Sequence, residues 1–180
     1  MRKEQKANYP ESARGAAALL VRMVLEDGAY TNIALNQYLR GSRLSDLDRR
    51  LATELVYGTV KASGTLDWYL AQCVSRPLDK VAGDILAILR ISTYQLLYMT
   101  RIPVSAAVNE AVKLARSVSH EGSAKFVNGV LRGLLRKQEA GAFVLPDAEK
   151  QDADYLSLQY YHPRWLVKRW LGPWGRGGTE

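Results

Sequence analysis

Residues 81–98 constrain the fold of this chain most, because hydrophobic side chains recur nearly all round the helix that they predict. The segment holds seven isoleucine and leucine residues: Ile85, Leu86, Ile88, Leu89, Ile91, Leu96 and Leu97. A helix that is apolar on every side has to be covered on every side. The segment therefore predicts a central, buried helix with other elements packed around it.

Capping residues mark the helices that precede this segment. Ser12 stands before apolar residues at helical spacing, and a serine side chain can accept a backbone N–H at a helix start. Thr31 is expected to cap a short second helix in the same way. Ser45 and Asp48 resemble a capping box, with Asp in place of the usual Glu or Gln. Three helix starts are therefore predicted before residue 50.

Glycine and proline mark the other expected boundaries. Gly64 predicts a helix end, with Thr65 starting the next helix. Pro103 opens a helix that residues 120–123 separate from another at 124–138. Short helices are expected at 153–160 and after Pro163. No segment alternates at period two, so the chain is predicted to be an all-α bundle of about seven to nine helices.

The composition favours a basic protein of the cytoplasm. Lys plus Arg number 25 and Asp plus Glu 18, which gives a net charge of +7 and favours an anionic partner. The single cysteine, Cys73, excludes an internal disulfide and fits a reducing compartment. No apolar run is long enough to cross a bilayer, so we expect no membrane partner.

A search for catalytic chemistry finds no complete set of residues. The chain has neither a GxGxxG turn after a strand nor a GxxxxGK[ST] loop. A zinc site would have to draw heavily on carboxylates, since His120 and His162 are the only histidines. We interpret His162 as a capping or hydrogen-bonding residue and Cys73 as a small buried hydrophobe. No catalysis, cofactor or metal is expected from this chain.

Basic residues gather at two places that suit nucleic acid. The polar segment 1–11 predicts a mobile basic arm leading into the first helix, and the helix after residue 123 carries three cations spaced by seven and four residues, which share one face. Free N–H groups are expected at Ser123, where they would suit a phosphate. The candidate RNA-binding residues are Arg2, Lys3, Lys6, Arg14, Lys125, Arg132 and Arg136.

Three residues of the helix pair at 103–138 contradict helix propensity. Asn109, Asn128 and Gly129 lie inside the expected helices, where such residues are unfavourable. We hypothesise that the two asparagines are buried and bond to each other across the helix pair. Gly129 is interpreted as a point of close helix–helix contact.

The segment HPRWLVKRWLGPW at 162–174 interleaves three tryptophans with basic residues. Such a pattern suits stacking on single-stranded bases. It also suits an amphipathic helix that docks on another domain through its tryptophans. Docking is the preferred interpretation.

Several of these motifs resemble the NusB-like RNA-binding fold. The segments that carry the resemblance are LR-x-x-x-Y-x-L from Leu89, PVSAAVNEAVKLA at Pro103–Ala115 and FVNGVL at Phe126–Leu131. The stretches SAR-x-x-A from Ser12 and LATELVYGTV up to Val60 match as well. The resemblance covers residues 12–138 and implies a helical bundle in which the basic N-terminal region and first helix bind RNA.

The segment HPRWLVKRW is similar to the one that follows this domain in RsmB (Sun/Fmu) enzymes. The resemblance implies an N-terminal, substrate-recruiting domain of a ribosomal RNA cytosine-C5 methyltransferase. That family's S-adenosylmethionine domain and its two catalytic cysteines have no counterpart here. The expected organisation is an arm at 1–11, a NusB-like domain at 12–140, and a linker with a Trp-rich extension at 141–180. The expected partners are ribosomal RNA and, through residues 162–174, the catalytic domain.

Two other functions stay open at the level of sequence. One is a stand-alone antitermination factor of the NusB type, for which HPRWLVKRW would be superfluous. The other is a protein-interaction module whose Trp-rich tail binds a partner. Homodimerisation, which part of the NusB-like family shows, stays open as well.

Overall fold

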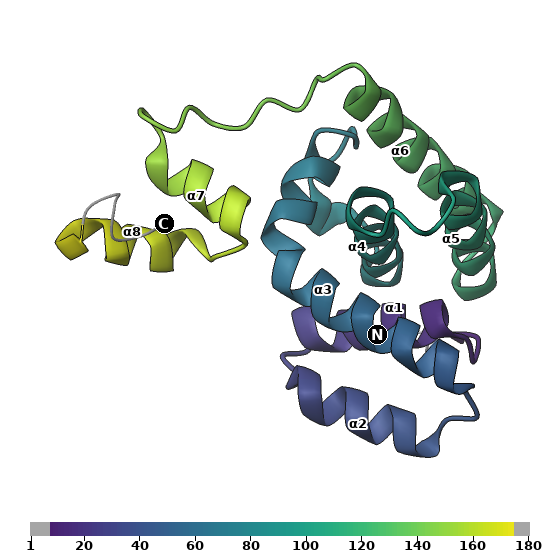
Figure 1. Ribbon diagram of the computed structural model, residues 1–180. Helices are drawn as coiled ribbons and strands as arrows, with labels where there is room; N and C mark the ends of the chain where they lie inside the picture. The colour runs from purple at the N-terminus through teal and green to yellow at the C-terminus, as the bar shows by residue number, and fades with distance from the viewer. Residues whose placement is uncertain (1–7, 175–180) are drawn as a thin grey trace, which may run out of the picture.

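The structure is a computed structural model that describes residues 8–174, and the regular secondary structure of these residues consists of helices without any strand (Figure 1). This confirms the all-α fold. None of the helices is long and apolar enough to span a membrane within the described part of the chain. The elements are α1 (Ala13–Leu25), α2 (Thr31–Gly41), α3 (Asp46–Ala71), the 3₁₀ turn η1 (Leu78–Lys80), α4 (Gly83–Tyr98), α5 (Val104–Val118), α6 (Glu121–Glu139), α7 (Asp152–Tyr160) and α8 (Arg164–Trp174).

Helix α4 is the centre of the bundle. It packs against α1, α3, α5 and α6, which surround it in Figure 1. Every residue from Ile85 to Thr93 is buried, including the polar ones. The prediction of a central buried helix is confirmed, because an all-round apolar sequence leaves no side for water.

The capping predictions hold at two of the three helix starts. The Ser12 side chain accepts the Gly15 backbone N–H, and the Ser45 side chain accepts that of Asp48. Ser45 Oγ also donates to the Asp48 carboxylate at 2.7 Å. The prediction for Thr31 was wrong, because Tyr30 holds the cap position without a side-chain bond and Thr31 is the first helical residue.

The expected helix end at Gly64 was also wrong. Helix α3, which is 26 residues long in all from Asp46 to Ala71, passes through it. Thr65 and Leu66, the next two residues, are buried. Glycine costs a helix interior only about 1 kcal/mol. The packing of both halves of α3 against neighbouring helices outweighs that cost.

Arg49 holds the end of α2 against the start of α3. Its three guanidinium nitrogens donate to the backbone carbonyls of Leu39, Ser42 and Leu44, at 2.8 to 3.0 Å. The last turn of a helix leaves carbonyls without partners, and this side chain supplies one. Arg49 is thus a structural cation rather than part of a binding surface.

The segment before α1 folds back over the helix. Tyr9 Oη donates to the Asp84 carboxylate, and Arg22 donates to the same oxygen at 3.0 Å. The Pro10 carbonyl lies so close that a Cβ at Gly15 would come within 2.1 Å of it. The arm expected at residues 1–11 is therefore tied to the bundle at its C-terminal end.

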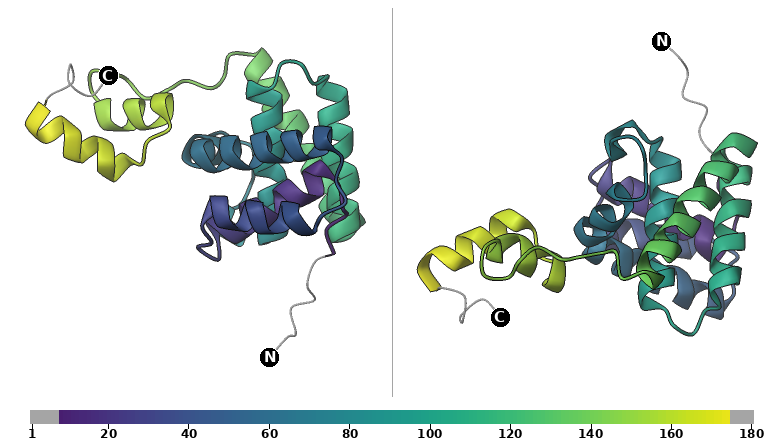
Figure 2. Two further views of the ribbon diagram at one scale, coloured as in Figure 1. Left: turned by 60° about the horizontal axis from the view of Figure 1, so that its bottom comes forward. Right: turned by 90° about the horizontal axis from the view of Figure 1, so that it is seen from above.

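Helices α7 and α8 form a small unit beside the bundle. Figures 1 and 2 show them at the end of an irregular segment that leaves α6. Ala153, Leu156 and Val167 make a hydrophobic cluster of their own. Thr65 of α3 donates to the Leu158 carbonyl at 2.9 Å, which fastens α7 to the bundle.

Candidate nucleic-acid interface

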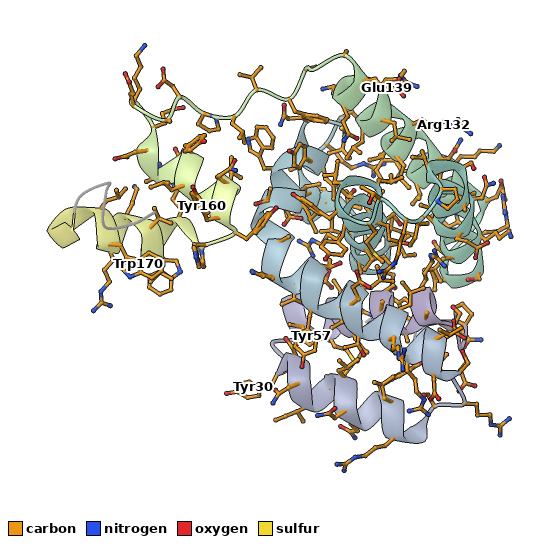
Figure 3. The ribbon with its side chains drawn as sticks, in the orientation of Figure 1. Tyr30, Tyr57, Arg132, Glu139, Tyr160 and Trp170 are labelled. Atoms are coloured by element: carbon orange, nitrogen blue, oxygen red, sulfur yellow. The ribbon has the colours of Figure 1, made fainter. Side chains whose placement is uncertain are left out.

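The outer side of α6 carries a row of cations, the α6 basic face, defined by Lys125, Arg132 and Arg136. All three are exposed, as their spacing predicts, and Figure 3 shows Arg132 on the outer side of the helix. At 1.5 Å per residue, Lys125 and Arg132 stand about 10 Å apart along the axis, and Arg136 about 6 Å further. None of the three forms an ion pair with a carboxylate of the described residues.

Gly129 lies within this face rather than in a helix contact. It is exposed, and a Cβ built on it would have no neighbouring atom within 4 Å. The interpretation of Gly129 as a point of close helix packing was wrong. It lies four residues after Lys125 and three before Arg132, so it opens a gap in the middle of the basic row. A phosphate backbone can approach the helix closely at such a gap.

The hypothesis that Asn109 and Asn128 bond across the helix pair was also wrong. Asn109 is exposed on α5. The Asn128 side-chain oxygen accepts from Arg132 Nε at 3.0 Å, one turn along the same helix. That bond holds the Arg132 guanidinium against the helix and leaves its terminal nitrogens available to a ligand.

The start of α6 differs from the prediction. The helix begins at Glu121, and His120 is its cap, with Nδ1 accepting the Ser123 N–H at 3.3 Å. The N–H group expected to be free at Ser123 is therefore engaged. Glu121 pairs with Arg116, whose hydrogen bond holds the pKa of that carboxyl below its ordinary value. This carboxylate makes the beginning of α6 less suited to an anion than its end.

Two further cations, from the α3–α4 connection, lie beside α6. The Arg76 guanidinium stands 4.9 Å above the centre of the Phe126 ring. Arg76 and Lys80 line a cavity of about 280 Å³ with His120 and Ser123. Sequence reasoning missed both, because they precede α4 and only the fold brings them to α6. They extend the positive surface on one side of the basic face.

Arg14 lies apart from the α6 basic face. It is on α1, which packs against α2, α3 and α4, whereas α6 packs chiefly against α5 and α4. Its Nε donates to Gln95 of α4 at 2.9 Å, and its side chain is half-buried. Among the four candidate residues that the structure describes, Arg14 is thus not joined to the three cations of α6. Arg2, Lys3 and Lys6 lie outside the described residues.

The environments of Cys73 and His162 do not suit a catalytic role. Burial raises the pKa of the Cys73 thiol, which keeps it protonated. The His162 ring lies edge-on to Trp170, 5.2 Å between centres, and the His162 backbone N–H and carbonyl bond to Ser157, in keeping with the predicted hydrogen-bonding role. No group of three His, Cys, Asp or Glu residues in the part of the chain that the structure describes is arranged to hold a metal ion.

The fold and this site define a helical domain built on a buried central helix and bearing an exposed cationic face. The chain belongs to the NusB family, whose profile matches residues 11–136. A probable ribosomal RNA small subunit methyltransferase B from Synechocystis sp. is 40% identical to it over 169 residues. One from Bacillus subtilis is 37% identical over 169 residues.

The match to these two relatives covers most of this chain but only part of theirs. The alignments include 94% of this chain and 37% of the length of either relative. Helices α7 and α8 lie beyond residues 11–136, so the relatives share with this chain a segment that the NusB profile does not include.

Solved structures give the same fold. The protein in the crystal structure of a plectonemic RNA supercoil aligns with a TM-score of 0.67 at 19% identity, over 72% of this chain and 95% of that one. A structure of the antitermination factors NusB and NusE with double-stranded RNA aligns at 0.64 and 20% identity, over 70% of this chain and 95% of that one. At these identities the likeness establishes the architecture alone.

Proposed function

We propose that this chain binds ribosomal RNA and is the substrate-recruiting region of a small-subunit rRNA cytosine-C5 methyltransferase. The observation that carries the proposal is the α6 basic face, three exposed cations around an open glycine that have no carboxylate partner among the described residues. Such a face contacts phosphates and recognises the shape of folded RNA rather than its sequence. The names of the relatives supply the class of RNA. The cytoplasm is the proposed location, because the single cysteine fits a reducing compartment.

Methyl transfer would take place on another domain of the same protein. The described residues contain no β-strand, so they offer no Rossmann-type pocket for S-adenosylmethionine. We propose that residues 162–174 dock this domain. Trp165 is 65% exposed on α8, a large apolar side chain without a partner in the described part of the chain. The basic residues beside it, Lys168 and Arg169, are also exposed.

A second candidate is an antitermination factor of the NusB type. The structural likeness to NusB favours it. The α7–α8 unit weighs against it, because this unit lies outside the NusB match and is shared with the methyltransferase relatives. We therefore rank the methyltransferase reading first. Homodimerisation is proposed for neither reading.

The experiment is a salt titration of binding between this chain and a fragment of small-subunit ribosomal RNA. The logarithm of affinity should fall linearly with the logarithm of salt, with about 0.7–0.9 of slope per phosphate contact. The triple variant Lys125→Gln/Arg132→Gln/Arg136→Gln should lower the slope by about 2 to 3 units. The matched control is Lys113→Gln on α5, an exposed lysine already paired with Glu110 at 3.0 Å.

The control should bind like the unaltered chain. Affinity that stays flat as salt rises would contradict the electrostatic mechanism. Absence of RNA binding at low salt would favour the third reading, a protein-interaction module.

A further inference from the structure

A trough lined by tyrosines runs between α3, α4 and the end of α7. One cavity, of about 180 Å³, is lined by Gly58, Lys61, Ala62, Tyr94, Tyr98 and Tyr161. A second, of about 410 Å³, continues along α3 toward Pro163 and shares Lys61 and Tyr161 with the first. We call the two together the tyrosine trough. It lies away from the α6 basic face, and the proposed function leaves it unassigned.

The trough is built from stacked rings. Tyr94 and Tyr98 are tilted against each other with centres 5.4 Å apart, and Tyr161 meets Tyr98 edge-on at 5.8 Å. Gly58 makes this possible, since a Cβ there would come within 2.1 Å of the Tyr94 ring. Tyr98 is 37% exposed, so part of its ring remains open to a ligand.

The polar groups of the trough suit an anion with a flat ring. Lys61 is exposed and has no carboxylate partner among the described residues. The nearby carboxylates are engaged, Glu54 by Arg101 and Asp154 by Arg164. Burial, together with a hydrogen bond to Tyr161, raises the pKa of Tyr98, so its hydroxyl stays neutral. The surface is therefore aromatic and positive.

Exposed aromatic residues continue beyond the rim. Tyr57, 46% exposed, lies one helical turn before Lys61 on α3, and Tyr160, 44% exposed, ends α7. Figure 3 shows both residues on the elements that border the trough. Tyr161, which lines this trough, lies outside the NusB match of residues 11–136, whereas the α6 basic face lies within that match.

We propose that the tyrosine trough binds an unpaired base of RNA, which stacks on Tyr98 while Lys61 contacts the adjoining phosphate. Bases splayed from single-stranded RNA stack on aromatic side chains, and a neighbouring cation follows the backbone. A purely apolar peptide would leave Lys61 without a partner. The inference rests on the proposed function, since it assigns a second contact to the same RNA. The tyrosine trough would contact a base, whereas the α6 basic face would contact phosphates.

The test compares two probes, a labelled single strand of ten adenosines and an abasic ribose-phosphate strand of equal length. The unaltered chain should bind the adenosine strand more tightly. Tyr98→Leu should weaken adenosine binding about 5- to 100-fold and leave abasic binding unchanged, as expected for loss of one stacked base. Tyr30→Leu is the matched control, because Tyr30 is 76% exposed and does not line the trough. It should alter neither affinity.

A measurement on the unaltered chain avoids any folding defect of the variant. Single-stranded RNA carrying 4-thiouridine, irradiated in complex, should cross-link to peptides containing Tyr98 or Tyr161. Cross-links confined to α6 would overturn the proposal. So would equal affinities of the unaltered chain for the two probes.

The outcomes separate this inference from the proposed function. If the α6 triple variant weakens both probes and Tyr98→Leu weakens neither, the trough does not bind RNA, although the proposed function stands. If the chain binds neither probe nor the ribosomal RNA fragment at low salt, both proposals fail.

Discussion

Replacing Gly15 by alanine should destabilise the protein, although alanine is the better helix former. Gly15 lies in the first turn of α1, below the chain segment that folds back over it. The atom nearest to a new Cβ would be the Pro10 carbonyl oxygen, at 2.1 Å. Backbone cannot swing aside as a side chain can, so residues 9–11 would have to lift away from the helix.

The cost follows from what this lift breaks. Tyr9 would lose its hydrogen bond to the Asp84 carboxylate, and a bond to a charged group contributes about 1.5–3 kcal/mol. Partial exposure of the Tyr9 ring adds about 1 kcal/mol. Alanine returns up to about 1 kcal/mol of helix propensity. The net loss is therefore about 1.5–3 kcal/mol of unfolding free energy.

Urea denaturation followed by circular dichroism measures this change. Gly64→Ala is the matched control, since it lies in α3 with no atom within 4 Å of a new Cβ. It should stabilise the protein by about 0.5–1 kcal/mol. Tyr9→Phe removes only the hydroxyl, and its effect should not add fully to that of Gly15→Ala, because both break one contact. A Gly15→Ala protein as stable as the Gly64→Ala protein would refute the reasoning.

Three further predictions concern other parts of the fold. Asp67→Asn should lower the free energy of unfolding, measured by urea denaturation, by about 2–4 kcal/mol. The reason is that Arg90, which is 9% exposed and bonded to both Asp67 oxygens, loses its counter-charge. A loss below about 0.5 kcal/mol would contradict this expectation. Burial raises the pKa of the Cys73 thiol, so less thiolate is present at any pH below that pKa. Alkylation of Cys73 should therefore be slower in the native chain than in urea, and the difference between the two rates should narrow as the pH rises. Equal alkylation rates, followed by mass spectrometry, would refute this expectation. Gly129→Ala should raise stability by about 0.5–1 kcal/mol yet weaken binding of ribosomal RNA, and a variant that binds more tightly would show that no backbone approaches there.

Local signals in the sequence predicted most of the helices. Ser12 and Ser45 act as caps because the hydrogen bonds involved span only three residues. The hydrophobic residues that recur nearly all round the helix at residues 81–98 predicted the central helix. The helix end predicted at Gly64 was wrong because glycine costs a helix only about 1 kcal/mol. The packing that keeps α3 helical at this residue comes from helices distant in the sequence.

The exposed position of Gly129 could have been predicted from the sequence. Lys125, Gly129, Arg132 and Arg136 follow one another at intervals of four, three and four, which places the glycine on the same exposed side as the cations. The tyrosine trough offers no such signal. It joins positions 58, 94 and 161, which only the tertiary fold brings together.

The three carbonyls held by Arg49 distinguish two kinds of basic position in this chain. At positions 125 and 136 of the α6 basic face a lysine and an arginine can replace each other, because a phosphate requires mainly the charge. At Arg49 the forked, planar guanidinium spans three acceptors at once, and a lysine ammonium cannot reproduce that geometry. Related sequences should therefore exchange the two residues freely at 125 and 136 and keep arginine at 49. An alignment would then separate the cations that bind a ligand from those that build the fold.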